Sequence, residues 1–467
     1  MVGKSVASAA GVDASGAKLD RRSARWAALC RWCVRHARSW RTAAWQLLFI
    51  ATVGVGGWPA LSQAELTAEP LGQVKALGPP SPHWILYFLF DGSPEVSKYV
   101  LFDADTLEYK AWISTGYIPS LVQSPDGRAL YVADTYMDGP ERLRRDVISF
   151  YDTHDYSFSG KIEMPENHRA MLGSQFRTGL VHDGRFLLSL KFKPGSGISV
   201  IDTSERRIVG EVDTPGCTLM YPTGKRGVSM ICGNASLLTI QFDDKGHVAS
   251  QTRSEPFFDP DADPVMENAA AIGGTWYFLS YAGNVHVVDL SGDLPQFRGN
   301  WPLSAGSGKR EGGGAGAGSA TSTRDTGAED GAWRPGGVQY IATHAARGEL
   351  YVLMHPVAMS GEYGHTFPGT EVWVFDAAEK SLKRRIPLKE MANTVFVTAD
   401  AKPLMITSGI SLLHGDRDAK IPPAQQVIAP VSNIHVYDAA TGGFLREAKE
   451  LGMTYYFDTA PGAGGTR

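Results

Sequence analysis

A short hairpin pattern that recurs along the sequence restricts the possible folds more than any other feature of this chain. In one copy, Gly197–Asp202 is followed by a polar turn and a second strand-like run. Ile198 and Val200 would lie on one face of a strand, because strand side chains alternate with a period of two. Asp202 would cap the turn by accepting hydrogen bonds from backbone N–H groups just ahead of it. The pattern predicts a β-hairpin opened by an aspartate.

This hairpin pattern occurs seven times, and in every copy the residues two and four positions before the aspartate are apolar or aromatic. The seven aspartates are Asp103, Asp152, Asp202, Asp244, Asp289, Asp376 and Asp438. The gaps between them are 49, 50, 42, 45, 87 and 62 residues. Strand-rich repeats of about 40–50 residues are typical of β-propellers. We therefore predict an all-β fold, a seven-bladed β-propeller over residues 83–467, with a β-sandwich as the alternative.

Two insertions account for the two long gaps. Residues 304–332 are rich in Gly, Ala, Ser and Thr, which cannot build a core, so a flexible excursion is expected there. A second insertion covers about 412–430. Three apolar runs that follow short turns are predicted to be the inner strands of blades: Ala129–Ala133, Phe186–Leu190 and Leu350–Met354.

The distribution of charge argues against a nucleic-acid partner. The whole chain has a formal net charge of −4, but residues 1–64 carry nine Lys/Arg against two Asp/Glu. The remainder therefore has a net charge of −11, from 36 basic and 47 acidic residues. A body this acidic would be repelled by a phosphate backbone.

The amino-terminal segment has the organisation of an export signal. A basic region is followed by an apolar run from Ala43 to Trp58, and small residues precede a predicted cut after Ala64. We therefore expect residues 1–64 to be a leader, residues 65–82 to be a lead-in, and the mature protein to be periplasmic. The alternative is an uncleaved membrane anchor, although the apolar run is short for a span and contains glycines.

Two cysteines, Cys217 and Cys232, remain after the predicted leader. In an exported protein, two cysteines fifteen positions apart most simply form a disulfide. Closing a loop of that size would stabilise the fold by about 3 kcal/mol in the chain-entropy model. A redox dithiol or a metal-binding pair is the alternative.

The sequence shows no self-contained active site. The twelve histidines are scattered, and neither a nucleophile elbow nor a phosphate-binding loop is present. A metal at His355 and His365, or calcium at Asp259, Asp261 and Asp263, are weaker alternatives to ordinary packing and turn roles. We therefore predict no catalytic or metal-binding residue on this chain, and binding through loops becomes the default expectation for a propeller.

Several segments resemble the heavy subunit of the quinoprotein amine dehydrogenases. The resemblance covers nearly all of residues 83–460 and is most specific from Cys217 to Ser254. It extends to Ser280–Val285, Trp333–Gly337 and Tyr351–Pro356. It looks closer to the aromatic (aralkyl) amine branch than to the methylamine branch. The two insertions depart from the family pattern.

The resemblance implies an enzyme built from two heavy propeller subunits and two small, disulfide-rich light subunits. The light subunit would carry the tryptophan tryptophylquinone cofactor and the catalytic base. Primary amines would be oxidised to aldehyde and ammonia, and electrons would pass to a blue copper protein such as azurin or amicyanin. This chain would hold the light subunit and shape the substrate channel.

One residue role is implied by the resemblance. The segment Thr115–Pro119 matches the family's short loop whose aromatic residue lines the amine channel, and Tyr117 stands where the family has Phe. Tyr117 is therefore the candidate channel residue, with a core aromatic as the alternative. Two other functions stay open: a binding propeller without enzymatic activity, and a methylamine-specific member of the family. A propeller with its own enzymatic site is disfavoured by the absence of haem and catalytic motifs.

Overall fold

The computed structural model describes residues 77–90, 97–139, 141–165, 168–171, 174–306, 332–412, 430–449 and 451–461. All of them belong to one compact unit, Val74–Arg467. The predicted leader, most of the lead-in and of the Gly-rich insertion, and nearly all of the second insertion lie outside the described residues. Within the described ranges, no helix is long and apolar enough to cross a membrane.

Five sheets of four strands follow one another along the chain. The first contains β28 (Met453–Thr459), β1 (Trp84–Phe90), β2 (Ser97–Asp103) and β3 (Glu108–Thr115). The second contains β4 (Ser120–Gln123), β5 (Ala129–Asp138), β6 (Leu143–Asp152) and β7 (Phe158–Glu163). The third contains β8 (Thr178–Val181), β9 (Phe186–Lys191), β10 (Gly197–Asp202) and β11 (Arg207–Asp213). The fourth contains β12 (Cys217–Thr223), β13 (Gly227–Cys232), β14 (Leu237–Phe242) and β15 (Val248–Arg253). The fifth contains β16 (Val265–Ile272), β17 (Thr275–Ser280), β18 (Asn284–Asp289) and β19 (Gln296–Pro302).

The remaining strands form one sheet of eight. They are β20 (Trp333–Pro335), β21 (Ile341–His344), β22 (Glu349–Pro356), β23 (Gly369–Asp376), β24 (Ser381–Val397), β25 (Leu404–Leu412), β26 (Pro430–Asp438) and β27 (Phe444–Ala448). Helical turns are short: η2 (Gln175–Arg177), η3 (Leu303–Gly306), η4 (Ala345–Arg347), α3 (Val357–Ser360) and η5 (Gly361–Thr366).

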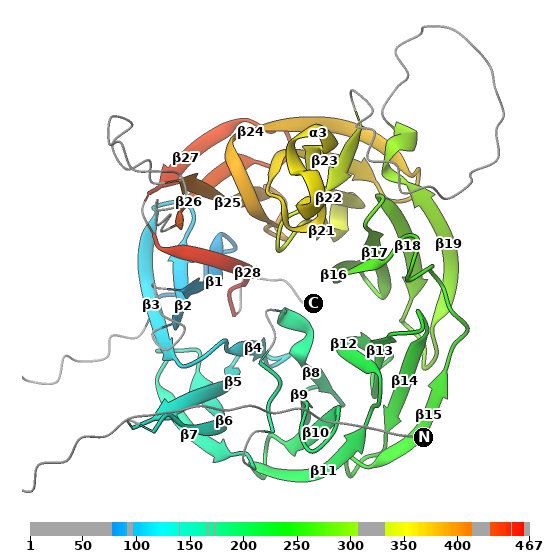
Figure 1. The fold of residues 1–467 in the computed structure, drawn as a ribbon. Helices are drawn as coiled ribbons and strands as arrows, with labels where there is room; N and C mark the ends of the chain where they lie inside the picture. Colours follow the sequence, from blue (N-terminus) through cyan, green and yellow to red (C-terminus); the bar gives the residue numbers. More distant parts are fainter. Residues whose placement is uncertain are drawn as a thin grey trace, which may run out of the picture. The chain divides into compact units, whose positions relative to one another are not determined.

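These sheets lie side by side around a common centre, which makes the unit an all-β β-propeller (Figure 1). In each four-stranded sheet one end strand faces the centre and the other lies at the rim. The central strands are β28, β4, β8, β12 and β16, and the rim strands are β3, β7, β11, β15 and β19. Strands β5, β9 and β22, predicted as inner strands, are instead the second strands of their blades. The prediction missed the shorter strands β4, β8 and β21, which have four residues each and give little sequence signal.

The prediction of seven separate blades is wrong. Five four-stranded blades stand apart, whereas the other eight strands share one continuous sheet. The cause is β24, which is 17 residues long. Its first half pairs with β23, from Ser381 opposite Asp376 onward. Its second half pairs with β25, up to Val397 opposite Met405. One strand therefore belongs to two ladders and joins what the repeat pattern treats as two units.

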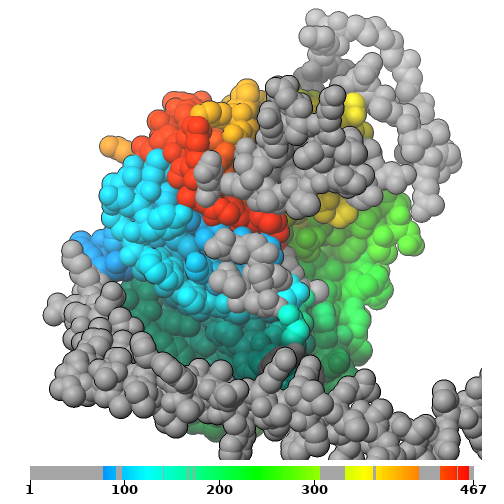
Figure 2. All heavy atoms as spheres, turned by 60° about the vertical axis from the view of Figure 1, so that its left-hand side comes forward, coloured from blue at the N-terminus to red at the C-terminus, as the bar shows by residue number. Residues whose placement is uncertain are grey.

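The ring is closed by strands from the two ends of the described chain. β28 pairs with β1 in antiparallel register, with Ile85 opposite Thr459 and Phe90 opposite Met453. In the space-filling view, the red surface of the last strands lies against the cyan surface of the early ones (Figure 2). The last strand thus supplies the innermost strand of the first sheet.

The seven predicted hairpins are all present, each between the third and fourth strands of its repeat. Six aspartates accept backbone N–H groups as expected; Asp202 Oδ1, for example, accepts from Ser204 (3.0 Å) and Glu205 (2.9 Å). The fourth hairpin differs, because β14 already ends at Phe242. There the capping residue is Asp243 rather than Asp244.

The core consists of clusters between neighbouring sheets. One cluster joins Ile85 and Phe102 of the first sheet to Ile406 and Ile434 of the eight-stranded sheet. Every residue of β10 is buried, so both faces of that strand are covered, not only the face carrying Ile198 and Val200. Because each blade is covered by a neighbour on both faces, its strands lack the alternation of buried and exposed residues that a strand with one solvent-facing side would show.

Candidate channel loop and its supports

The loop that carries Tyr117 connects β3, at the rim of the first sheet, to β4, at the centre of the second. Tyr117 is half-buried, and its backbone N–H donates to the carbonyl of Thr135 at 2.6 Å. The structure thus places Tyr117 in the loop that connects the first blade to the second. Whether its side chain lines an amine channel stays a prediction.

Gly116 allows the loop to pass close to β5. A Cβ atom at this position would lie 2.2 Å from the carbonyl oxygen of Thr135, so only glycine fits. The Gly116 N–H donates to both carboxylate oxygens of Asp134, at 2.9 and 2.8 Å. Asp134 is 1 % exposed. Burial raises the pKa of this carboxyl above its ordinary value, against the lowering effects of the Gly116 amide and Arg169.

Two arginines hold the next three carbonyl groups of the loop. Arg169 Nη2 donates to the carbonyls of Tyr117 (2.8 Å) and Ile118 (2.5 Å). Arg177 donates from Nη1 to Ile118 (2.9 Å) and from Nη2 to Pro119 (2.6 Å). Three consecutive carbonyls therefore accept four hydrogen bonds from two guanidinium groups. We call Arg169 and Arg177 the arginine pair.

A second layer fixes Arg169 in turn. Its Nε donates to Thr135 Oγ1 at 3.1 Å, and its backbone N–H donates to Asp146 Oδ2 at 2.9 Å. Thr135 Oγ1 donates to Asp146 Oδ1 at 2.7 Å. Arg144 pairs with the same carboxylate at 2.9 Å and donates to the carbonyl of Arg169. This network is polar, connected and almost completely enclosed.

The electrostatic cost of this arrangement is substantial. Arg169 and Arg177 are each 3 % exposed, and removing a cation from water costs several kcal/mol unless hydrogen bonds compensate. Burial, together with the charge of Arg177, lowers the pKa of Arg169 to about 9. Burial lowers the pKa of Arg177 to about 10. Both groups therefore stay protonated at neutral pH and act as permanent donors.

The predicted disulfide is present between Cys217 and Cys232. The two residues stand opposite each other in the β12–β13 ladder, so the bond fastens the open end of that hairpin. Both side chains are buried. The metal and redox alternatives for this pair are therefore not supported.

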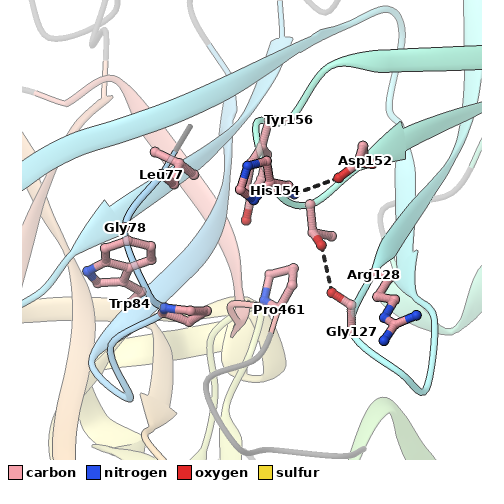
Figure 3. A pocket seen from close by; sticks show the side chains of 11 residues that line it. Leu77, Gly78, Trp84, Gly127, Arg128, Asp152, His154, Tyr156 and Pro461 are labelled. Atoms are coloured by element: carbon pink, nitrogen blue, oxygen red, sulfur yellow. Dashed lines mark hydrogen bonds between the residues drawn. The ribbon is translucent and has the colours of Figure 1, made fainter. Parts of the chain in front are cut away.

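A cavity of about 420 Å³ lies beside the turn at Gly127, which follows β4 in the chain (Figure 3). It is lined by Trp84, the turn at Gly127, the 152–156 turn and Pro461. Its polar groups are engaged within turns: the His154 N–H donates to Asp152 at 2.7 Å, and Thr153 donates to the Gly127 carbonyl at 2.7 Å. The Asp152 carboxylate in this cavity thus acts as a turn cap.

Two further cavities, of about 440 and 210 Å³, adjoin the centre of the ring. Both are lined by Phe176, Trp276, Asp458 and Thr459 together with residues of the inner strands. Asp458 is the one ionisable side chain among their described lining residues. These cavities offer space and apolar surface, but not a catalytic set.

The weaker metal hypotheses find no support in the described residues, where no group of three or more His, Cys, Asp or Glu side chains could hold an ion. Asp259 accepts the backbone N–H groups of Asp261 and Ala262, as a turn residue does. Asp263 bonds Ser280 and Asn284. The acidic cluster is therefore occupied by turn contacts.

The arginine pair and its supports were not identified from the sequence. Arg169 lies in an irregular segment and Arg177 in the short turn η2, both between β7 and β8, and neither residue belongs to a sequence motif or a hydrophobic period. Asp134 carries more signal, because it lies within the strand β5, and a carboxylate buried there needs hydrogen-bond partners. The sequence alone could not show which loop those partners would come from.

The fold and the loop define a β-propeller protein in which a buried polar network holds the backbone of one connection between two blades. The sequence model of the methylamine dehydrogenase heavy chain family matches residues 94–316 and 321–415. The chain therefore belongs to that family, and the resemblance to amine dehydrogenase heavy subunits is confirmed. The matched region contains the Tyr117 loop, the arginine pair and both cysteines of the disulfide.

Proteins of similar sequence are also described as methylamine dehydrogenase heavy chains. The methylamine dehydrogenase heavy chain of Methylophilus methylotrophus is 26% identical over 399 residues, which is 83% of this chain and 86% of that protein. The one from Methylobacillus flagellatus is 25% identical over 405 residues, covering 85% of this chain and 88% of that protein. Among solved structures, dihydro-heme d1 dehydrogenase NirN matches with a TM-score of 0.50 and 14% identity, covering 86% of this chain and 79% of that chain. At that identity the last likeness concerns the fold alone.

Proposed function

We propose that this chain is the heavy subunit of a periplasmic dehydrogenase that oxidises primary amines to aldehyde and ammonia. The observation that carries the proposal is the family match, which spans about two thirds of the chain and includes the candidate channel loop. In the overall reaction an amine and water give an aldehyde, ammonia, two protons and two electrons. The electrons leave through a partner, because the proposed role of this chain is structural.

The proposed partner is a small light subunit that carries tryptophan tryptophylquinone, in an assembly of two heavy and two light chains. That cofactor supplies the two-electron oxidant. The heavy chain would hold the light subunit and surround the approach to it, with Tyr117 at the channel. A blue copper protein such as azurin or amicyanin is the proposed electron acceptor. The relatives' description as heavy chains supports a light-chain partner.

The preferred amine is a finer part of the proposal. We propose an aromatic or aralkyl amine, on the basis of the resemblance at the Tyr117 loop and the 217–254 segment. Methylamine is the competing substrate, and the description of the curated relatives favours it. A channel residue sorts amines by size, because an apolar wall discriminates by the methylenes it accommodates.

The test is co-purification from periplasmic extract of amine-grown source cells. We expect a small second chain and a quinone absorbance that a primary amine bleaches. Phenylethylamine should bleach it with a higher kcat/KM than methylamine; the reverse order would make the chain part of a methylamine-specific enzyme. A single colourless chain that ignores amines would reject the dehydrogenase role and favour a binding propeller. Recovery only with the cytoplasm would reject the periplasmic location.

A further inference from the structure

We infer that Arg169 and Arg177 are positioning residues for amine selection, because they fix the backbone of residues 116–119 in one conformation and so determine where the Tyr117 side chain lies. This inference rests on the proposed function, in which Tyr117 faces the amine. The arginine pair would touch neither substrate nor cofactor. It would act only through the loop.

Four of the hydrogen bonds that the pair donates go to the backbone of one short segment, and the remaining ones, to Thr135, Ala170 and Ser174, hold the guanidinium groups in place. The carbonyls of Tyr117, Ile118 and Pro119 accept these four bonds from Nη2 of Arg169 and from both Nη atoms of Arg177. The N–H groups of the loop are held separately, Gly116 by Asp134 and Tyr117 by the Thr135 carbonyl. Donors and acceptors of the loop backbone are thus fixed from both sides, while the Tyr117 side chain is left half-buried.

The loop is held against a conformational preference. Ile118 has a φ of 43°, in the left-handed region that a β-branched residue strongly disfavours. Such a conformation persists only when surrounding contacts over-determine it, and it occurs preferentially at functional sites. Here the Ile118 carbonyl accepts from both arginines, so the strained residue is also the most firmly held one.

A purely stabilising role does not account for this design. A pair of buried cations is expensive, and apolar side chains of similar volume often stabilise a core as well or better. What guanidinium groups provide is geometry: a planar fork with fixed donor directions, which an ammonium group lacks. The two arginines therefore contribute more to fixing the backbone conformation of the loop than to the stability of the ring.

The first test measures the loop itself and needs no amine. Hydrogen exchange of residues 115–120 is followed in the full chain, with its light subunit where one co-purifies. In the unmodified protein we expect these amides to exchange far more slowly than the exposed turn at residues 291–294. Arg177→Lys and Arg169→Lys should each speed the loop amides by about tenfold, the size expected for losing a charge-assisted hydrogen bond.

The matched control is Arg446→Lys. Arg446 also donates to a backbone carbonyl, that of Ala104, and pairs with Asp105, but it lies on β27. Its substitution should leave exchange at residues 115–120 unchanged. Because the unmodified loop is measured as well, the inference can fail even if a lysine variant does not fold: fast exchange of that loop would overturn it.

The second test measures selection in the holoenzyme. The ratio of kcat/KM for phenylethylamine to that for methylamine should change by about tenfold in Arg177→Lys, the scale on which an apolar wall discriminates. In a Tyr117→Ala background the same arginine substitution should change the ratio no further, because it acts through Tyr117. A loss of stability alone would not produce this dependence.

The outcomes separate the two proposals. Unchanged loop exchange in folded Arg169→Lys and Arg177→Lys variants would overturn the positioning role. Faster exchange with an unchanged amine ratio would overturn its link to selection; if Tyr117→Ala also leaves the ratio unchanged, the fault lies in the proposed role of Tyr117. Absence of any amine activity would reject the proposed function, and with it the selection role. The exchange result would still show whether the arginine pair fixes the loop.

Discussion

Glu349, at the start of β22, has a buried carboxylate that forms ion pairs with three cationic side chains. Arg347, Lys383 and Arg384 each lie 3.0 Å from it, and the Tyr351 hydroxyl donates at 2.7 Å. Burial alone would raise the pKa of Glu349, but these hydrogen bonds outweigh it and hold the pKa well below its usual range. The carboxylate therefore stabilises the fold above its unfolded pKa, and that contribution is lost as the pH falls below about 4.5.

We predict that Glu349→Gln lowers the free energy of unfolding by about 3 kcal/mol at neutral pH. The value lies at the low end for a broken buried pair, because the three cations are 20–37% exposed and can be rehydrated. Urea denaturation measures it. The control is Glu205→Gln, which removes an exposed pair with Arg207 and should cost less than about 1 kcal/mol. Equal effects of the two substitutions would contradict the prediction.

His435 on β26 gives a pH dependence in a different range. It is fully buried, with Glu447 at 3.4 Å and Glu390 at 3.8 Å from Nε2, and with Lys389 also near. Burial lowers the pKa of His435 more than the two carboxylates raise it. Below pH 6.5 the unfolded chain therefore binds a proton that the folded chain resists, so stability falls as the pH falls.

We predict that His435→Gln makes stability less dependent on pH between 6.5 and 5. The change in slope has an upper limit of one proton, or about 1.4 kcal/mol per pH unit. Denaturation midpoints at several pH values measure the slope. His247→Gln removes a 61% exposed histidine and should leave the slope as it is. A slope that His435→Gln leaves unchanged would show that other groups carry the acid sensitivity.

At the level of single residues, the sequence predicts what depends on nearby positions. Six of the seven aspartate caps stand where the hairpin pattern put them, because a cap bonds amides two or three residues ahead. The shift to Asp243 reflects a turn one residue longer than in the first copy, where Asp103 pairs with Glu108. The supports of Tyr117 come from residues up to 60 positions away, and no local pattern encodes them.

Within the part of the chain that the structure describes, the β12–β13 hairpin is the one element pair closed by a disulfide. We predict that replacing Cys217 and Cys232 together by serine lowers the free energy of unfolding by about 3 kcal/mol. The two residues are already neighbours in the ladder, so the folded geometry should change little. Guanidinium denaturation of the oxidised protein and of the double variant measures the difference. An unchanged midpoint would mean that the loop is already restricted in the unfolded chain.

The length of β24 and its pairing with two neighbours could not be predicted from the sequence repeat. The hairpin pattern divides the chain after Asp376 and after Asp438 and assigns one blade to each. Backbone hydrogen bonding does not follow that division, because nothing between Ser381 and Val397 breaks the strand: Pro387 lies opposite Glu371 without ending it. Repeat spacing counts hairpins correctly. It does not reveal whether two neighbouring sheets share a strand.

For the whole ring, we predict that a chain ending after Leu451, and so lacking β28, loses cooperative unfolding. It would leave one edge of β1 without its ladder and remove Phe457 from the cluster that contains Ile85 and Tyr87. An uncovered central edge also favours aggregation. Thermal unfolding and protease cleavage within β1–β3 measure the effect. A chain ending after Pro461 retains β28 and is the control; if both chains melt alike, closure does not stabilise the ring.

The β1–β28 ladder also sets an order in time. Ile85 and Thr459 stand opposite each other although nearly the whole described chain separates them. Because a ribosome synthesises the chain from the amino end, one edge of β1 lacks its partner strand until β28 has been made. Contacts this distant in sequence form slowly. We therefore expect the new chain to expose this edge, and to stay unfolded or bound to a chaperone, until its synthesis is complete.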